Sequence, residues 1–151
     1  MNSQQLQLVN FEQAKRLKQL GFDRECLCRY NVRKTKSGEK VTLAKPPTVR
    51  NYIDWNNHWY NNKETFPNAN SFLISAPTIA LALKWFRDVK MIGCSVTQVI
   101  LIGKKSKEYT FSYNKTYGCD YCTHDFDTYE SAESALLDEL LTLIEKENES
   151  I

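Results

Sequence analysis

The first element that the pattern of apolar and polar positions predicts is a helix over residues 6–20. Phe11, Ala14 and Leu17 recur at three-residue steps between charged and amide side chains, which is the spacing of one helical face. Gly21 follows the last apolar position, where helices often end in a residue with positive φ. The pattern therefore predicts an amphipathic helix that stops at the glycine.

Two further helices are expected in the second half of the chain. Residues 75–91 are apolar around most of a helical circumference, which is typical of a central, buried helix, and Ser75 is expected to cap it. The last helix is expected to begin at Asp127 or Thr128, each followed by acidic residues that suit a helix N-terminus. Residues 145–151 are expected to fray.

A first hairpin is indicated where the period changes from three or four residues to two. Residues 26–33 alternate, with one set of side chains expected to point inward: Cys26, Cys28, Tyr30 and Val32. Residues 36–39 are expected to form a turn, because serine and glycine stand at its centre. Residues 40–43 are then expected to return as a second strand, with Val41 and Leu43 inward.

A second hairpin is expected from residues 95–102 and 108–113, which are rich in β-branched and aromatic side chains. Residues 48–70 combine aromatic side chains with many asparagines, which predicts an ordered loop with one helical turn. The element order is α-β-β-loop-α-β-β-α. It predicts an α+β fold in one domain over residues 1–151, with a four-stranded antiparallel sheet from two hairpins and three helices.

Length and composition support a folded domain. A chain of 151 residues, 42% hydrophobic and 25% charged, can form a core without disulfides, and 5 glycines and 4 prolines exclude collagen-like and linker-like chains. The net charge is +2, but residues 1–65 hold twelve Lys/Arg against six Asp/Glu, whereas residues 125–151 hold one against nine. This asymmetry fits either a nucleic-acid-binding face with an acidic tail or two ordinary solvated surfaces.

The cysteine count and the apolar runs favour a cytoplasmic protein. The five cysteines are an odd number, and the first residues lack the basic and apolar regions of a signal peptide. No apolar run approaches the roughly 20 residues of a membrane span. Reduced thiols and no membrane partner are therefore expected.

A zinc site is one candidate for chemistry. Cys119 and Cys122 have the two-residue spacing with which a pair of thiolates can bind one tetrahedral zinc, and His124 is close enough in sequence to add a third ligand. Cys26 or Cys28 could supply the fourth ligand. The alternative is that these two cysteines are small core residues. Only one residue separates Cys26 from Cys28, which is fewer than in the cysteine pairs of most structural zinc sites.

Nucleic-acid binding is a second candidate. Basic residues gather on the two hairpins, and the residues proposed to contact nucleic acid are Arg33, Lys34, Lys36, Lys104, Lys105 and Lys107. Arg29 and Lys40 stand on the first hairpin as well. Basic turns can make salt-dependent phosphate contacts, and aromatic side chains can stack on unpaired bases. The alternative is that these lysines protect strand edges and keep the protein soluble.

Catalysis is not expected, and neither is a cofactor. The chain has two histidines, His58 and His124. Its sequence contains neither the G-x-S-x-G motif of a serine nucleophile nor a glycine-rich phosphate-binding motif. Cys122 and His124 resemble a dyad only in their types, because no third residue that could orient them stands nearby in sequence.

Three segments resemble a group of short uncharacterised proteins encoded by Bacteroidetes bacteria and their phages and prophages. They are LGFD (20–23), SAPTIALALKWFR (75–87) and DTYESAESALLDELL (127–141). The resemblance covers most of the chain in order. It implies a protein of a phage or mobile element, but no reaction and no site residues.

The main functional hypothesis is a non-enzymatic module that binds an unidentified protein partner. Its proposed contact residues are the aromatic side chains of the asparagine-rich loop: Tyr52, Trp55, Trp59 and Tyr60. Trp and Tyr are efficient anchors in protein interfaces, and in this hypothesis the two tryptophans stand at the rim of the core. Nucleic-acid binding and a zinc-stabilised domain are the alternatives.

Overall fold

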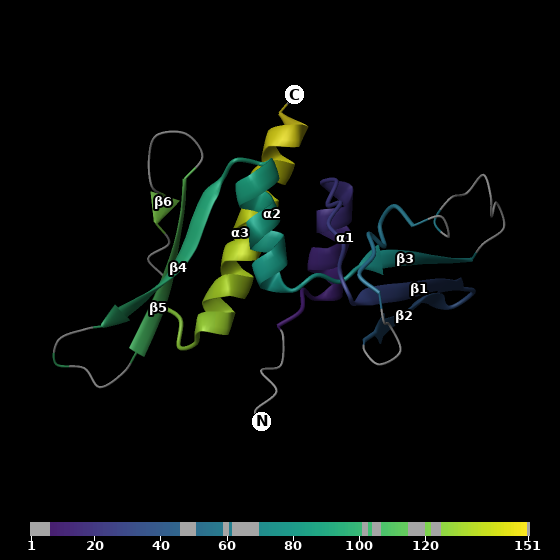
Figure 1. Cartoon of the computed structure of the whole chain (residues 1–151), viewed down its shortest axis with the longest axis horizontal. Helices are drawn as coiled ribbons and strands as arrows, with labels where there is room; N and C mark the ends of the chain where they lie inside the picture. Colours follow the sequence, from purple (N-terminus) through teal and green to yellow (C-terminus); the bar gives the residue numbers. More distant parts are fainter. Residues whose placement is uncertain are drawn as a thin grey trace. The chain divides into compact units, whose positions relative to one another are not determined.

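The computed structural model describes residues 7–45, 51–58, 61, 70–100, 103, 107–114, 120–121 and 125–150. The chain divides into two compact units, Leu8–Thr78 and Met1–Gln7 with Ile79–Ile151, where the sequence analysis expected one domain over residues 1–151. Each unit contains its own three-stranded antiparallel sheet (Figure 1). The two units are described in turn.

The unit Leu8–Thr78 holds one helix and the first sheet. Its elements are α1 (Phe11–Gln19), β1 (Arg29–Thr35), β2 (Gly38–Ala44) and β3 (Ser71–Ser75), and the strand order is β2-β1-β3. The turn between β1 and β2 depends on Gly38, whose φ of 127° is reached easily only by glycine. Thr35 Oγ1 donates a hydrogen bond to Gly38 O at 2.7 Å, which closes the predicted hairpin.

Local sequence signals explain both ends of α1, which is shorter than the predicted 6–20. Asn10 caps the N-terminus, because its side chain accepts a hydrogen bond from Gln13 N while the Gln13 side chain accepts one from Asn10 N. At the other end Gly21 has φ 85°, and Phe22 N donates to Leu17 O at 3.0 Å. The predicted glycine stop is therefore confirmed.

Helix α1 packs on one face of the β2-β1-β3 sheet. The Phe11 and Tyr30 rings meet edge to face at 5.4 Å, and Tyr30 Oη donates to Val9 O at 2.7 Å. The predicted inward set is confirmed, since all four side chains are buried: Cys26, Cys28, Tyr30 and Val32. The prediction for the second strand holds less well, because Leu43 is 36% exposed at the sheet's outer edge.

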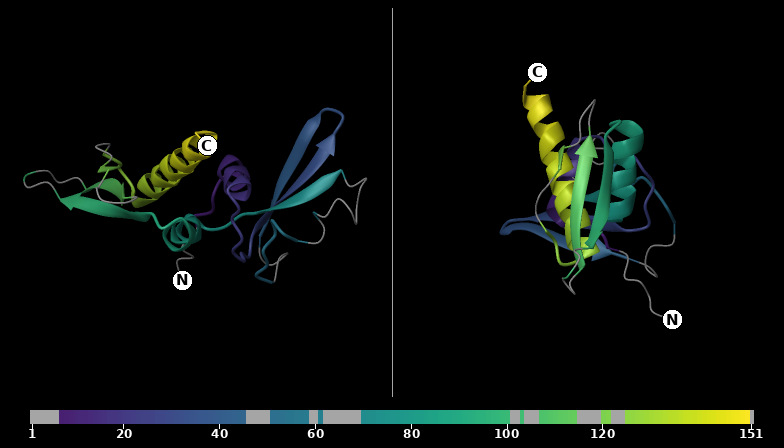
Figure 2. Two further views of the ribbon diagram at one scale, coloured as in Figure 1. Left: turned by 90° about the horizontal axis from the view of Figure 1, so that it is seen from above. Right: turned by 90° about the vertical axis from the view of Figure 1, so that its left-hand side faces the viewer.

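The second unit holds the other two helices and the second sheet. Its elements are α2 (Ile79–Val89), β4 (Gly93–Ile100), β5 (Lys107–Asn114), β6 (Asp120–Tyr121) and α3 (Tyr129–Glu149), and the strand order is β4-β5-β6. Helix α3 lies along β4 and β5 (Figure 2). The predicted start is confirmed at Thr128, whose side chain accepts from Ser131 N. The helix continues to Glu149, through residues for which the sequence predicts fraying.

The predicted α+β class and both hairpins are confirmed, but a single four-stranded sheet is wrong. Each hairpin gains its own third strand, β3 beside β1 and β6 beside β5. Ser75, predicted as a helix cap, is the last residue of β3, and α2 begins at Ile79. Helix α2 is also not buried on all sides, since Val89 is 44% exposed.

No helix in the described part of the chain is long and apolar enough to cross a membrane.

Candidate functional site

The β2-β1-β3 sheet has a polar face opposite the side chains that pack on α1. Side chains alternate along a strand and register partners share a face. The open face therefore carries these side chains of β1, β2 and β3: Arg29, Asn31, Arg33, Thr35, Lys40, Thr42, Ala44, Ser71, Leu73 and Ser75. Arg33, Lys40 and Thr42 are exposed. Three of the side chains are cationic and none is a carboxylate, so the open face favours anions.

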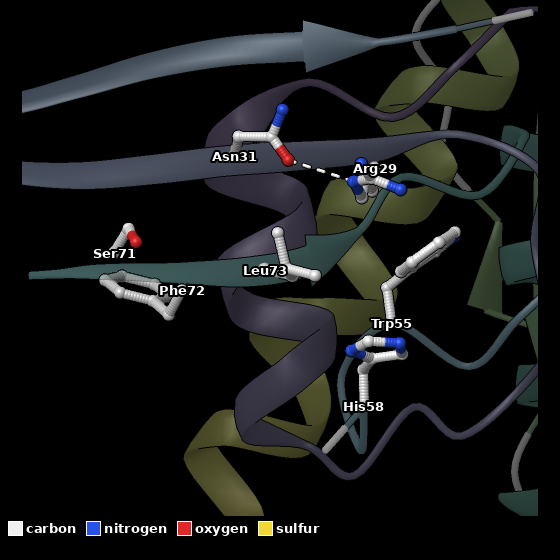
Figure 3. A pocket seen from close by; sticks show the side chains of 7 residues that line it. All are labelled: Arg29, Asn31, Trp55, His58, Ser71, Phe72 and Leu73. Carbon is white, nitrogen blue, oxygen red and sulfur yellow. Dashed lines mark hydrogen bonds between the residues drawn. The ribbon is translucent and has the colours of Figure 1, made fainter. Parts of the chain in front are cut away.

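A recess of about 390 Å³ lies at one end of this face. Figure 3 shows its walls, in which Arg29 and Asn31 project from β1, Ser71 and Leu73 come from β3, and Trp55 and His58 come from the loop. A second recess of about 310 Å³ continues along the face between Asn31, Arg33 and Lys40. The open face is therefore hollowed along much of β1.

The Arg29 guanidinium is fixed in two ways. Its Cζ lies 4.2 Å from the centre of the Trp55 ring, and its Nε donates to Asn31 Oδ1 at 2.9 Å. Trp55 lies between Arg29 and His58, whose ring centre is 5.3 Å from its own (Figure 3). Stacking on an aromatic ring and a hydrogen bond together restrict a side chain that is otherwise mobile.

Trp55 is held in place by the chain segment just before β1. Cys26 and Ile53 exchange two backbone hydrogen bonds, and the Trp55 indole N–H donates to Cys26 O at 2.9 Å. Trp55 is only 5% exposed. The expectation that Trp55 stands at the rim as a free protein-binding anchor is therefore wrong, because its indole is packed and hydrogen-bonded inside the unit.

Two asparagines of the same loop bind the outer edge of β3. Asn61 accepts from Leu73 N at 2.7 Å through Oδ1 and donates to Leu73 O at 2.9 Å through Nδ2, as a neighbouring strand would. Asn56 accepts from Ser75 N at 3.0 Å and donates to Phe22 O at 2.9 Å. Side-chain amides thus satisfy the edge of the sheet and anchor the loop that carries Trp55.

The predicted nucleic-acid residues that the structure describes lie on different faces and in different units of the chain. Arg33 lies on the open face, but Lys34 points to the opposite face, where Glu39 is its register partner. Lys36 lies in the hairpin turn and Lys107 begins β5 in the other unit, while Lys104 and Lys105 lie outside the described residues. The period of two along β1 and β2 could have separated Arg29, Arg33 and Lys40 from Lys34.

Of the other three predicted protein-binding residues, the structure describes Tyr52. Tyr52 is 67% exposed and is available to a partner. Trp59 and Tyr60 lie outside the described residues.

The zinc hypothesis stays a prediction, since Cys119, Cys122 and His124 also fall outside the described ranges. Cys26 and Cys28, suggested as fourth ligands, are buried, and Cys26 Sγ donates to Cys28 O at 3.3 Å. Desolvation raises the pKa of the Cys26 thiol to about 11 and raises the pKa of Cys28 as well. Both thiols are therefore protonated at neutral pH, as expected of small core residues.

Comparison with known proteins adds no relative: no family model, curated protein or solved structure matches this chain.

Proposed function

We propose that this protein binds single-stranded nucleic acid through the open face of the β2-β1-β3 sheet. The observation that carries the proposal is the chemistry of this face, on which the described strand residues include Arg29, Arg33 and Lys40 and no carboxylate. Cations without neighbouring carboxylates favour a polyanion, because phosphate contacts then replace no internal ion pair.

Single strands fit this face better than a duplex does. Unpaired bases need flat or apolar surfaces to stack on, and the recess offers the Arg29 guanidinium plane beside Leu73. In the described residues of this unit, no helix lies on the open face to enter a major groove, since α1 packs on the other side of the sheet.

The test is oligonucleotide binding by the full chain, measured by fluorescence anisotropy as the salt concentration rises. With about three phosphate contacts, log K is expected to fall with a slope of about −2 against log salt. Arg33→Gln is expected to weaken binding severalfold and to reduce that slope by about 1. A duplex of the same sequence is expected to bind more weakly.

Lys34→Gln is the matched control, because it removes the same charge from the adjacent residue on the opposite face. It is expected to leave the affinity within about twofold, as exposed substitutions away from a site usually do. Equal losses for Arg33→Gln and Lys34→Gln would show that the face does not matter. No binding at low salt would remove the proposal.

Binding of a protein partner is the second candidate, and the observation that favours it is the exposure of Tyr52. An absence of oligonucleotide binding at low salt, with a partner lost on Tyr52→Ala, would favour this function. In either case we propose a non-enzymatic protein without a cofactor, acting in the host cytoplasm as an accessory of a phage or mobile element.

A further inference from the structure

We infer that Arg29 is the phosphate-binding residue of the recess and receives a phosphate group on its two terminal guanidinium nitrogens. This inference rests on the proposed function and names the ligand group that the recess takes. It depends on three features, which are the fixed position of Arg29, the absence of a counter-ion in the described walls, and the donors beside it.

The first feature is that the internal contacts of Arg29 leave its binding edge unused. Stacking on Trp55 holds the guanidinium plane, and the hydrogen bond to Asn31 uses Nε. In the described residues no acceptor meets the two Nη atoms. A guanidinium held in this way presents a rigid pair of donors, which matches two oxygens of one phosphate.

The second feature is that Arg29 lies in a recess whose described walls contain no acid. The lining residues are Arg29, Asn31, Trp55, His58, Ser71, Phe72 and Leu73. Other cations of the chain have carboxylate partners, such as Lys15 with Glu12 at 2.8 Å. A half-buried cation without a counter-ion loses hydration that an anionic ligand would replace.

The third feature is the chemistry around the expected phosphate. Because Asn31 Oδ1 accepts from Arg29, the two N–H groups of the Asn31 amide remain as donors. Leu73 adds an apolar surface for a sugar or base. A recess of about 390 Å³ is within the size range of small-ligand sites.

The phosphate can come from a strand end, from within a strand or from a free nucleotide, and all three share the same oxygens. The experiment therefore uses the full ¹⁵N-labelled chain and follows the Arg29 Nε–H and Trp55 Nε1–H signals by NMR. The probes are inorganic phosphate, adenosine 5′-monophosphate, adenosine, glutamate, and an oligonucleotide with or without a 5′-phosphate. We expect phosphate and the monophosphate to shift both signals, and adenosine and glutamate not to.

Arg29→Lys keeps the charge but removes the paired donors and the stacking plane. It is expected to weaken binding of adenosine 5′-monophosphate about tenfold. The matched Arg24→Lys, at an exposed arginine outside the recess that pairs with Asp23, is expected to change it less than about twofold. Asn31→Asp is the second variant, because it leaves Arg29 in place and gives it an internal carboxylate. This variant is expected to fold with unchanged or higher stability and to lose phosphate binding, so that a loss cannot be attributed to unfolding.

Each alternative outcome has a definite meaning. Equal effects of Arg29→Lys and Arg24→Lys would overturn the inference, as would shifts by adenosine or glutamate as large as those by the monophosphate. A 5′-phosphorylated oligonucleotide that binds more tightly than its unphosphorylated form would identify a strand end as the source, and equal affinities an internal phosphate. Oligonucleotide binding that survives Arg29→Lys unchanged would overturn the inference alone, whereas no oligonucleotide binding by the natural chain would remove the proposed function.

Discussion

The two sheets are built alike, each from a hairpin and a short third strand, but their open faces differ in chemistry. The β2-β1-β3 face carries Arg29, Arg33 and Lys40. On the β4-β5 pair, the face opposite the packed Phe111 carries small hydroxyl side chains, among them Ser95 and Thr97, which are exposed. No described side chain on this second face is cationic, whereas three described side chains on the first face are.

The difference shows that the alternating pattern of a hairpin predicts which side of the sheet is buried, but not the chemistry of the open side. Both hairpins bury one side, with Tyr30 and Val32 in the first and Phe111 in the second. What sets the first face apart is the asparagine-rich loop, which packs Trp55 beside β1 and fixes Arg29. The recess on the first sheet therefore combines a cationic side chain, Arg29, with the rigid aromatic ring of Trp55.

The largest effect is expected from Trp55→Ala, which removes the ring that positions Arg29. Loss of this buried side chain and its hydrogen bond to Cys26 should lower the free energy of unfolding by about 3–5 kcal/mol. Phe111→Ala in the other unit should cost a similar amount but leave oligonucleotide affinity unchanged. Urea unfolding followed by circular dichroism, with anisotropy on the folded variants, measures both. If Phe111→Ala reduced affinity as much, the comparison between the sheets would fail.

An intermediate effect is expected from Asn61→Ala, which uncovers the edge of β3. Leu73 N–H and C=O would each lose a hydrogen-bond partner, and we expect a loss of about 1–3 kcal/mol in the free energy of unfolding. Asn57→Ala is the control, because the exposed Asn57 bonds only to Asp54 in the described part of the loop. It should change stability by less than about 0.5 kcal/mol. Similar losses for both variants, measured by urea unfolding, would contradict a specific role for the Asn61 amide.

The smallest effect is expected from adding charge to the second sheet. Ser95→Lys with Thr97→Lys places two cations on its exposed hydroxyl face and should change stability by no more than about 0.5 kcal/mol. Oligonucleotide affinity should rise less than about threefold and only at low salt, because flexible lysines supply charge but no rigid donors. A gain as large as the loss caused by Arg33→Gln would show that charge alone decides binding.

Local signals in the sequence were sufficient for the elements. The glycine stop of α1, the turn at Gly38 and the cap at Thr128 are each decided by residues within a few positions of one another. The alternation along β1 correctly placed Tyr30 and Val32 inside. These features could be predicted because hydrogen bonding and side-chain direction within a turn, a cap or a strand depend on near neighbours.

The sequence by itself determined three helices, two hairpins and a basic first half, whereas the tertiary structure decided which strands pair and where Trp55 lies. Strand pairing between β1 and β3 joins residues about forty positions apart, as in Arg29 with Ser75 or Arg33 with Ser71. The sequence alone is equally compatible with an exposed Trp55. In the structure, the pairing of Cys26 with Ile53 places the Trp55 indole against the backbone carbonyl of Cys26. Such contacts are favourable only when distant segments meet, so no local pattern records them.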